Sequence, residues 1–376
     1  MKFLVAPNAF KETLTAQEAA REISTIILRH IQDAEIIQQP IADGGDGTCE
    51  LIIDSVGFEK VFQLTLNPIG QPVVGFFGLD RNTSRAFLDV STASGLGLLS
   101  NRQKVPDLAS TYGTGVLIQS AIQSGAKEIF LGLGGSATVD LGTGILSALG
   151  ILFLDQSGRE IPVFSPGYLE RIAHVQVSPK LPKVKFTLMC DVKNPLLGEM
   201  GAVRIFGPQK GIKAENLGDY ENQIQRVQKL LAKKKKETWK DLAGFGAAGG
   251  IASGLDCFFP TQIEFGAQYF FELVGLKKYV EKVDWIITGE GKYDTQSHQG
   301  KGCFELLKLA KEYGKKIALI TSGNEAAGEG FDLILKLPPV DLGRPDFKET
   351  ALENFRKTLL KALAANCFDE KRKGGF

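Results

Sequence analysis

Apolar residues near both ends of the chain fall into short runs that alternate with stretches of helical periodicity. Residues 2–6 predict a buried strand, and Thr15 followed by Glu18 has the spacing of a capping box that opens a helix to about Ile31. Residues 34–38 predict the next strand. Near the other end the predicted elements are a strand at 285–288, a helix at 304–313, and strands at 316–321 and 331–336. This order predicts a doubly wound α/β domain with a parallel sheet, built from both ends of the chain.

The middle of the chain has a different pattern. Strands are predicted at 61–66, 73–79 and 86–90, and the turns that join them are too short to hold helices. This is an antiparallel meander, so we expect a second α/β domain inserted into the first. The predicted domains are residues 1–58 with 284–376, and residues 59–283.

Charge and cysteine content narrow the class of partner. The chain has 44 basic and 43 acidic residues, which leaves no field to attract nucleic acid or an anionic membrane. The basic run Lys233–Lys236 is predicted to end an amphipathic helix that includes Leu217 and Leu231. The five cysteines lack the spacing of a metal site or disulfide framework, and residues 1–7 do not resemble a secretory signal. We therefore expect a cytoplasmic protein with small-molecule partners and no nucleic-acid or membrane partner.

Glycine is the unusual residue, with 43 copies that cluster beside predicted strands. Ligands of open α/β sheets bind beyond the carboxyl ends of strands, so such clusters can meet in one cleft. Six clusters stand out, most of them directly after a strand: residues 6–11 (APNAFK), 40–48 (PIADGGDGT), 111–115 (TYGTG), 132–140 (GLGGSATVD), 190–198 (CDVKNPLLG) and 288–301 (TGEGKYDTQSHQGK).

Backbone amides in glycine-rich turns at helix starts are suited to phosphate. The candidate nucleotide- and phosphate-binding residues are Gly134, Gly135, Ser136 and Thr138, with Gly113 and Thr114. One alternative is a tight turn without a ligand. Another is a dinucleotide-binding oxidoreductase, in which Gly132, Gly134 and Ala137 form the turn and Asp155 follows a second strand at 151–154. The chain contains no P-loop motif, so a phosphate site here must be of another design.

Carboxylates beside these turns could serve phosphoryl transfer, which needs acids to hold magnesium and to accept the proton of the attacking hydroxyl. Asp43 and Asp46 are candidate metal ligands, although both could simply form turns or cap helices. Asp191 ends the predicted strand 185–190 and is the candidate base, with Asp43 the next candidate. Glu290 and Asp294 are candidate substrate-binding residues.

Cations are needed to bind a carboxylate substrate and to offset charge on the transferring phosphate. Lys11 follows the first strand, whereas Lys210 and Lys301 lie in glycine turns. We expect Lys11 or Lys301 to neutralise the substrate carboxylate. A surface position is the alternative for all three, most of all for Lys210.

In this order the clusters resemble the glycerate kinase type 1 family of bacteria, from about Phe3 to Gly323. The segments that carry the resemblance are residues 7–11, 43–47, 93–96, 112–115, 134–138, 190–196, 206–211, 244–250 and 288–301. Val139 and Leu141 depart from it, since the family usually has Asn and Gly there. The resemblance implies an ATP- and Mg²⁺-dependent kinase that phosphorylates D-glycerate, commonly to 2-phosphoglycerate. It also implies a flavodoxin-like domain with the second domain inserted.

The kinase interpretation accounts for six clusters, whereas the oxidoreductase alternative accounts for one. We expect in-line transfer in a cleft between the domains, by a monomer or homodimer. A non-catalytic ligand-binding protein is the remaining alternative.

Overall fold

The computed structural model describes residues 1–10, 13–235, 238–293, 301–341 and 343–368. The chain forms two compact units, a terminal unit of residues 1–43 and 266–376 and a central unit of residues 44–265. These boundaries differ from those expected at 58/59 and 283/284. Helix α2 (Thr48–Val56) packs on strands of the central unit, and α10 (Ala267–Val274) packs on a helix of the terminal unit. The expected boundaries were placed next to predicted strands. In the structure each of these two helices belongs to the unit on which it packs.

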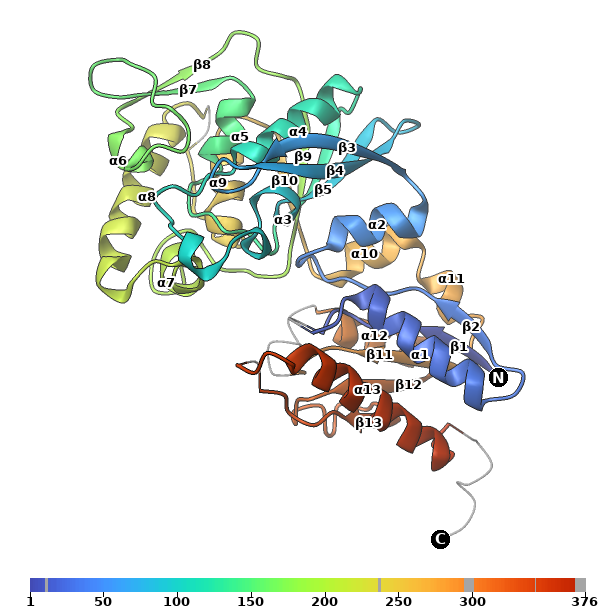
Figure 1. The fold of residues 1–376 in the computed structure, drawn as a ribbon. Helices are drawn as coiled ribbons and strands as arrows, with labels where there is room; N and C mark the ends of the chain where they lie inside the picture. The colour runs from blue at the N-terminus through green and yellow to red at the C-terminus, as the bar shows by residue number, and fades with distance from the viewer. Residues whose placement is uncertain (11–12, 236–237, 294–300, 342, 369–376) are drawn as a thin grey trace. The chain divides into compact units, whose positions relative to one another are not determined.

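The terminal unit contains a five-stranded sheet in which every pairing is parallel. Figure 1 shows the first strands of the chain beside strands from its last third. Across the sheet the strands are β13 (Leu333–Lys336), β12 (Lys316–Thr321), β11 (Trp285–Gly289), β1 (Lys2–Val5) and β2 (Glu35–Gln38). Numbered within the unit, this is the order 2-1-3-4-5 of flavodoxin-like folds, as expected.

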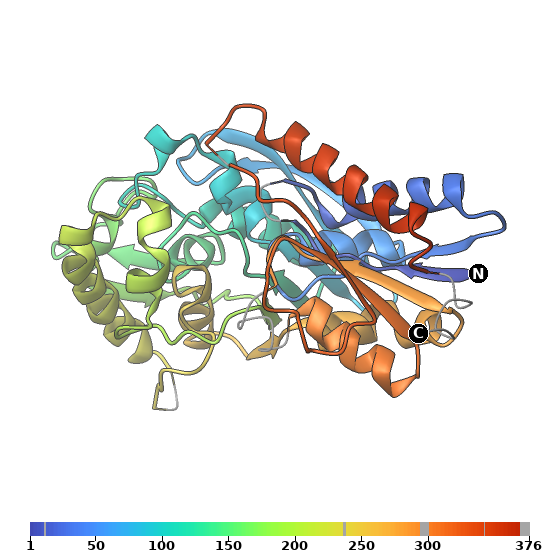
Figure 2. The same cartoon turned by 90° about the horizontal axis from the view of Figure 1, so that it is seen from below.

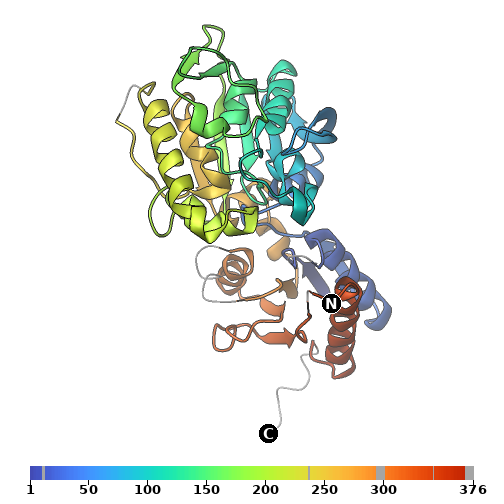
Figure 3. The ribbon, with the colours of Figure 1, turned by 60° about the vertical axis from the view of Figure 1, so that its left-hand side comes forward.

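Helices cover both faces of this sheet (Figure 3). Helices α1 (Ala16–His30) and α13 (Phe347–Ala364) pack together on one face, and α12 (Gly302–Glu312) packs with α10 and α11 (Lys277–Val280) on the other. Along β12, Ala318 and Ile320 join the core beneath α1 and α13, whereas Leu319 between them packs with Cys303 of α12. This alternation buries both faces, which explains the continuous apolar run of the strand.

The central unit contains a six-stranded mixed sheet (Figures 1 and 2). Its strands, in order, are β10 (Thr261–Phe265), β9 (Lys185–Cys190), β6 (Glu128–Gly132), β5 (Arg85–Asp89), β4 (Pro72–Asp80) and β3 (Glu59–Leu66). Strands β3, β4 and β5 pair antiparallel, which confirms the predicted meander, and β5, β6, β9 and β10 run parallel.

Helices α2 and α4 (Tyr112–Gln123) approach this sheet from opposite faces at two glycines of β4. A methyl group at Gly78 would lie 2.3 Å from the Ile53 side chain of α2, and one at Gly75 would lie 2.9 Å from Leu117 of α4. Both positions therefore need the smallest residue. The remaining helices are α3 (Ser91–Ser94), α5 (Thr143–Ala148), α6 (Tyr168–Arg171), α7 (Ala202–Phe206), α8 (Leu217–Ala232) and α9 (Ile251–Asp256).

Strand β7 (Ile151–Leu154) does not join the large sheet. It pairs antiparallel with β8 (His174–Val177) in a separate two-stranded sheet. Asp155 beyond it accepts hydrogen bonds from the backbone of Ser157 and Arg159 and so forms a turn. A dinucleotide-binding unit needs this second strand parallel to the first, so the arrangement does not support the oxidoreductase alternative.

In the described part of the chain, no helix combines the length and apolarity needed to cross a membrane.

Candidate functional site

The carboxyl ends of three parallel strands meet at one edge of the central sheet. In the strand register Asp89 of β5 lies opposite Gly132 of β6, and Gly132 lies opposite Met189 of β9. The loops after β6 and β9 therefore leave the sheet side by side. This is the edge at which open α/β sheets bind ligands.

The loop that contains Asp46 packs against the loop after β6. A methyl group at Gly134 would lie 2.1 Å from the Asp46 nitrogen, and one at Gly135 would lie 2.7 Å from the Asp46 carboxylate. Gly44, in the same loop as Asp46, packs closely against the end of β9. A methyl group at Gly44 would lie 2.8 Å from the backbone of Cys190, the residue before Asp191. Three of the sequence clusters thus come together, with the Asp46 side chain exposed to solvent.

Two backbone amides in the loop after β6 have no hydrogen-bond acceptor among the described residues. Leu133 donates to the Met189 carbonyl and Ala137 to the Ser94 carbonyl, but no residue in the described part of the chain accepts from the amides of Gly134 or Gly135. Two unused amides in a glycine turn beside a carboxylate suit a phosphate with its counter-ion.

The hydroxyl groups of this loop stabilise its turn, and their predicted phosphate-binding role stays a prediction. Ser136 is 4% exposed and Thr138 is fully buried, and their oxygen atoms lie 3.1 Å apart. The Thr138 amide donates to the Ser136 hydroxyl, which closes the turn.

Gly113 and Thr114 also have packing roles. Both are buried in the first turn of α4, where a methyl group at Gly113 would lie 1.8 Å from the Leu66 carbonyl oxygen. The Thr114 hydroxyl lies 2.7 Å from that of Ser94. These contacts use the small side chains for close approach to β3 and α3.

Asp89, at the end of β5, was not among the predicted site residues. Its side chain is buried and accepts hydrogen bonds from the amides of Cys49 at 3.1 Å and Glu50 at 3.0 Å, which fixes the first turn of α2 behind the Asp46 loop. Burial raises the pKa of Asp89 to about 7, and the Asp46 charge acts in the same direction. The sequence feature that could have identified Asp89 is a carboxylate within an otherwise apolar strand.

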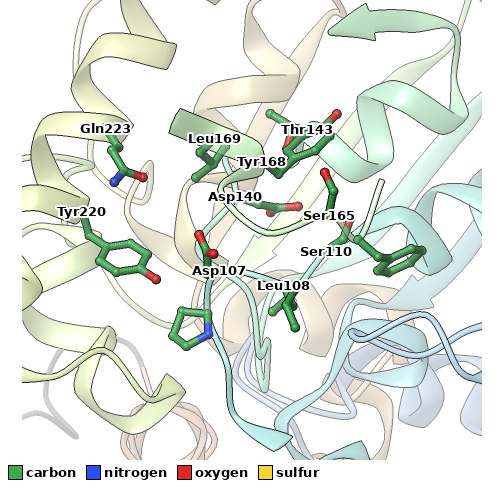
Figure 4. Close-up of a pocket in the computed structure, with 13 residues that line it drawn as sticks. Asp107, Leu108, Ser110, Asp140, Thr143, Ser165, Tyr168, Leu169, Tyr220 and Gln223 are labelled. Atoms are coloured by element: carbon green, nitrogen blue, oxygen red, sulfur yellow. The ribbon is translucent and has the colours of Figure 1, made fainter. Parts of the chain in front are cut away.

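Asp140 ends the loop and organises the next turn. Its carboxylate accepts from the amide and hydroxyl of Thr111 and from the amides of Gly142 and Gly144. Burial raises its pKa, although these donors act against the shift. Asp140 and Thr143 line a narrow pocket with Asp107, Tyr168 and other side chains (Figure 4). The pocket includes none of the predicted phosphate-binding residues.

Lys210 is buried, so the surface alternative is wrong for this lysine. Its side chain is 3% exposed, and its ammonium donates to the Thr138 carbonyl oxygen at 2.7 Å. Burial lowers the pKa of Lys210 to about 7, with Asp140 acting in the opposite direction.

The terminal unit has its own cluster, at the point where strand order reverses between β1 and β11. The Asn8 amide donates to the Gly289 carbonyl oxygen at 2.8 Å, and its side-chain nitrogen donates to Asp43 at 2.9 Å. Glu290 follows β11 and is buried, and Lys301 directly precedes α12. Ligands bind at such switch points. Asn8 was not among the predicted site residues, although it lies in the first cluster.

Two predicted site residues, Lys11 and Asp294, lie outside the described residues. Their roles stay predictions, as do those of Asp43, Glu290 and Lys301.

The model of the glycerate kinase family matches residues 3–364. A glycerate kinase of Haemophilus influenzae is 38% identical over 85% of both chains, and one of Bacillus subtilis is 34% identical over 95% of this chain and 96% of its own. The glycerate 2-kinase of Escherichia coli is 35% identical over 84% of both chains. A crystal structure from Salmonella typhimurium LT2, assigned to glycerate kinase 2, has a TM-score of 0.79 and 32% identity over 98% of both chains.

Proposed function

Because the chain belongs to the glycerate kinase family and is a kinase enzyme, we propose that it transfers the γ-phosphoryl group of ATP to D-glycerate, yielding 2-phosphoglycerate. The structural observation that supports this proposal is the contact between the Asp46 loop and the Gly134–Gly135 turn. This contact places a carboxylate beside backbone amides that no described residue uses. Phosphoryl transfer needs positioned donors and a metal ion more than covalent chemistry.

The Gly134–Gly135 turn is assigned to the phosphates of ATP. Its amides are donors fixed by a packed backbone, so they need little reorganisation when an anion binds. Asp89 keeps the opposing loop in place through the first turn of α2.

Mg²⁺ fits this arrangement through Asp46. Among the described residues no three His, Cys, Asp or Glu side chains cluster to form a metal cage. Mg²⁺ commonly binds through one or two carboxylates together with substrate phosphates and water, which an exposed Asp46 beside the phosphate turn satisfies. The bound ion would neutralise charge on the phosphates.

Asp191 is assigned as the base. It directly follows β9 and is half-buried at the carboxyl edge of the sheet. The glycerate hydroxyl oxygen would attack the γ-phosphorus, its proton would pass to Asp191, and the bond from the γ-phosphorus to the bridging oxygen would break to release ADP.

Phosphorus NMR of an incubation with D-glycerate, ATP and Mg²⁺ tests the reaction and its product. We expect ADP and 2-phosphoglycerate to appear together. Formation of 3-phosphoglycerate would overturn the assigned product, and ADP formation that ignores glycerate would overturn the function.

The Asp191→Asn variant tests the base. We expect kcat to fall roughly 10²- to 10⁴-fold, with a much smaller change in KM for glycerate, because the proton acceptor acts in the transition state. Asp219→Asn, on the exposed surface of α8, is the matched control and should keep parental kinetics. Near-parental kcat in a folded Asp191→Asn enzyme would mean that the base lies elsewhere.

A further inference from the structure

Lys210 lies in a turn that is packed tightly on both sides. A methyl group at Gly207 would lie 2.2 Å from the Val203 carbonyl oxygen, and one at Gly211 would lie 2.4 Å from the Lys104 carbonyl oxygen. The turn therefore has little freedom to move, and it directs the lysine side chain into the protein. Burying an ammonium costs free energy unless it finds partners. Its hydrogen-bond partner is the Thr138 carbonyl oxygen, at 2.7 Å.

A second turn encloses the same carbonyl group. Ala248, Gly249 and Gly250 adopt left-handed conformations in succession, with φ values of 50°, 69° and 93°. A methyl group at Gly249 would lie 2.1 Å from the Thr138 carbonyl oxygen. Thr138 is fully buried, and among the described residues only Lys210 donates a hydrogen bond to its carbonyl oxygen. The 138–139 peptide is thus held between Lys210 and the 248–250 turn.

The orientation of this peptide determines the direction of the next amide. In a trans peptide the carbonyl and the following N–H point in opposite directions, so the Val139 amide points away from Lys210. Val139 is 2% exposed, and its amide has no acceptor in the part of the chain that the structure describes. A hydrogen bond to the carbonyl also polarises the peptide and strengthens its N–H as a donor.

Lys210 supplies a basic side chain, which the loop itself lacks. Among the described residues it is the one cation that hydrogen bonds to the loop of residues 134–140. We propose that Lys210 is a positioning residue for phosphoryl transfer, which orients the loop from behind and takes up a proton when the polyphosphate of ATP binds. This inference rests on the proposed function, since it takes the loop to be the phosphate site.

The proton comes from solvent and goes to the Lys210 Nζ atom. In the free protein the pKa of Lys210 is about 7, because burial disfavours its charge. A polyanion bound near the loop favours the ammonium and raises this pKa. Between the two values the free lysine is mostly neutral and the complexed one mostly charged, so proton uptake should grow as the pH rises above 7. Among the described residues, Asp140 is the charged side chain that acts on the pKa of Lys210, and its carboxylate already accepts four hydrogen bonds.

Calorimetric titration with MgATP tests the proposal, in buffers of different ionisation enthalpy from about pH 7.5 to 9, where the proton uptake is expected. The full-length wild-type protein should take up a fraction of a proton that approaches about one. Lys210→Met removes the charge and the donor, whereas Lys210→Gln removes the charge and keeps an N–H donor. Both should lose the uptake and bind MgATP roughly 10- to 100-fold more weakly. Lys229→Met, on the exposed face of α8, is the matched control and should change neither quantity.

The outcomes separate this inference from the proposed function. Wild-type protein that binds MgATP without proton uptake would overturn the role of Lys210, and this measurement does not depend on a variant folding. So would Lys210→Gln with parental affinity and uptake, while glycerate phosphorylation by the wild type would still support the function. A third outcome is that MgATP binding by the wild type takes up a proton, that both variants lose this uptake, and that the wild type does not phosphorylate glycerate. This outcome would support the role of Lys210 and refute the proposed function.

Discussion

Gly134→Ala is the substitution for which the structure makes the sharpest prediction. An added methyl group would lie 2.1 Å from the backbone nitrogen of Asp46 and 2.4 Å from the carbonyl carbon of Gly45. Both are backbone atoms, so no side chain can rotate away. The two loops must therefore move apart.

The size of the movement follows from ordinary contact distances. Contact is unstrained from 3.4 Å, so the loops must separate by about 1.3 Å at Asp46, the difference between 3.4 and 2.1 Å. A misplacement of about 1 Å can lower a rate roughly 10²-fold. Overpacking of this kind costs about 1–3 kcal/mol of stability, which a domain of this size tolerates. We therefore expect a folded variant whose kcat/KM for ATP is about 10²-fold lower.

Steady-state kinetics with a coupled ADP assay and thermal unfolding together test this prediction. Gly97→Ala is the matched control, since a methyl group there meets nothing within 4 Å. The control should keep parental activity, with little change in stability. Parental kinetics in Gly134→Ala would refute the contact between the loops as the basis of ATP binding.

Three further predictions follow from the metal assignment, the buried lysine and the cysteines. Glycerate-dependent ADP release should stop in excess chelator and return with Mg²⁺, and Asp46→Asn should raise the Mg²⁺ requirement roughly 10-fold or more; activity unaffected by chelator would contradict this. Stability in denaturant should rise between about pH 7 and 8.5, because the unfolded chain still binds the proton that Lys210 has released, while the cysteines are still protonated in both states. The rise is at most about 2 kcal/mol and should vanish in Lys210→Met. In a native-state thiol assay exposed Cys367 should react at once, whereas the four buried cysteines, such as Cys49 with its raised pKa, should react only on unfolding.

Local patterns were sufficient to predict most elements of the fold. The predicted strands 185–190 and 316–321 have the bounds of β9 and β12, and the capping box at Thr15 is present at the start of α1. Periodicity and capping are properties of neighbouring residues, so they can be seen in one sequence. The domain boundary depends instead on which sheet α2 packs against, and its own residues do not encode that choice.

The site was predicted less completely because its decisive contacts join distant segments. The clusters of Asp46 and Gly134 were identified from their glycines, but their mutual contact was not. Lys210 bonds to a residue 72 positions away, Asn8 to one 35 away, and Asp89 to one 40 away. No periodic pattern contains such pairs. The local sequence of a lysine in a glycine turn does not indicate whether its side chain lies in solvent or in the core.

Leu141 shows how packing can override a backbone preference within this site. The residue adopts a left-handed conformation with φ of 56°, which suits glycine and costs other residues about 1–2 kcal/mol. The leucine is fully buried, however, and a methyl group at Gly250 would lie 2.6 Å from its side chain. Burying such a side chain contributes about 1.5–3 kcal/mol, which offsets the strain. The leucine is therefore compatible with a glycine-like backbone only because Gly250 leaves room for it, so the two positions have to be considered together.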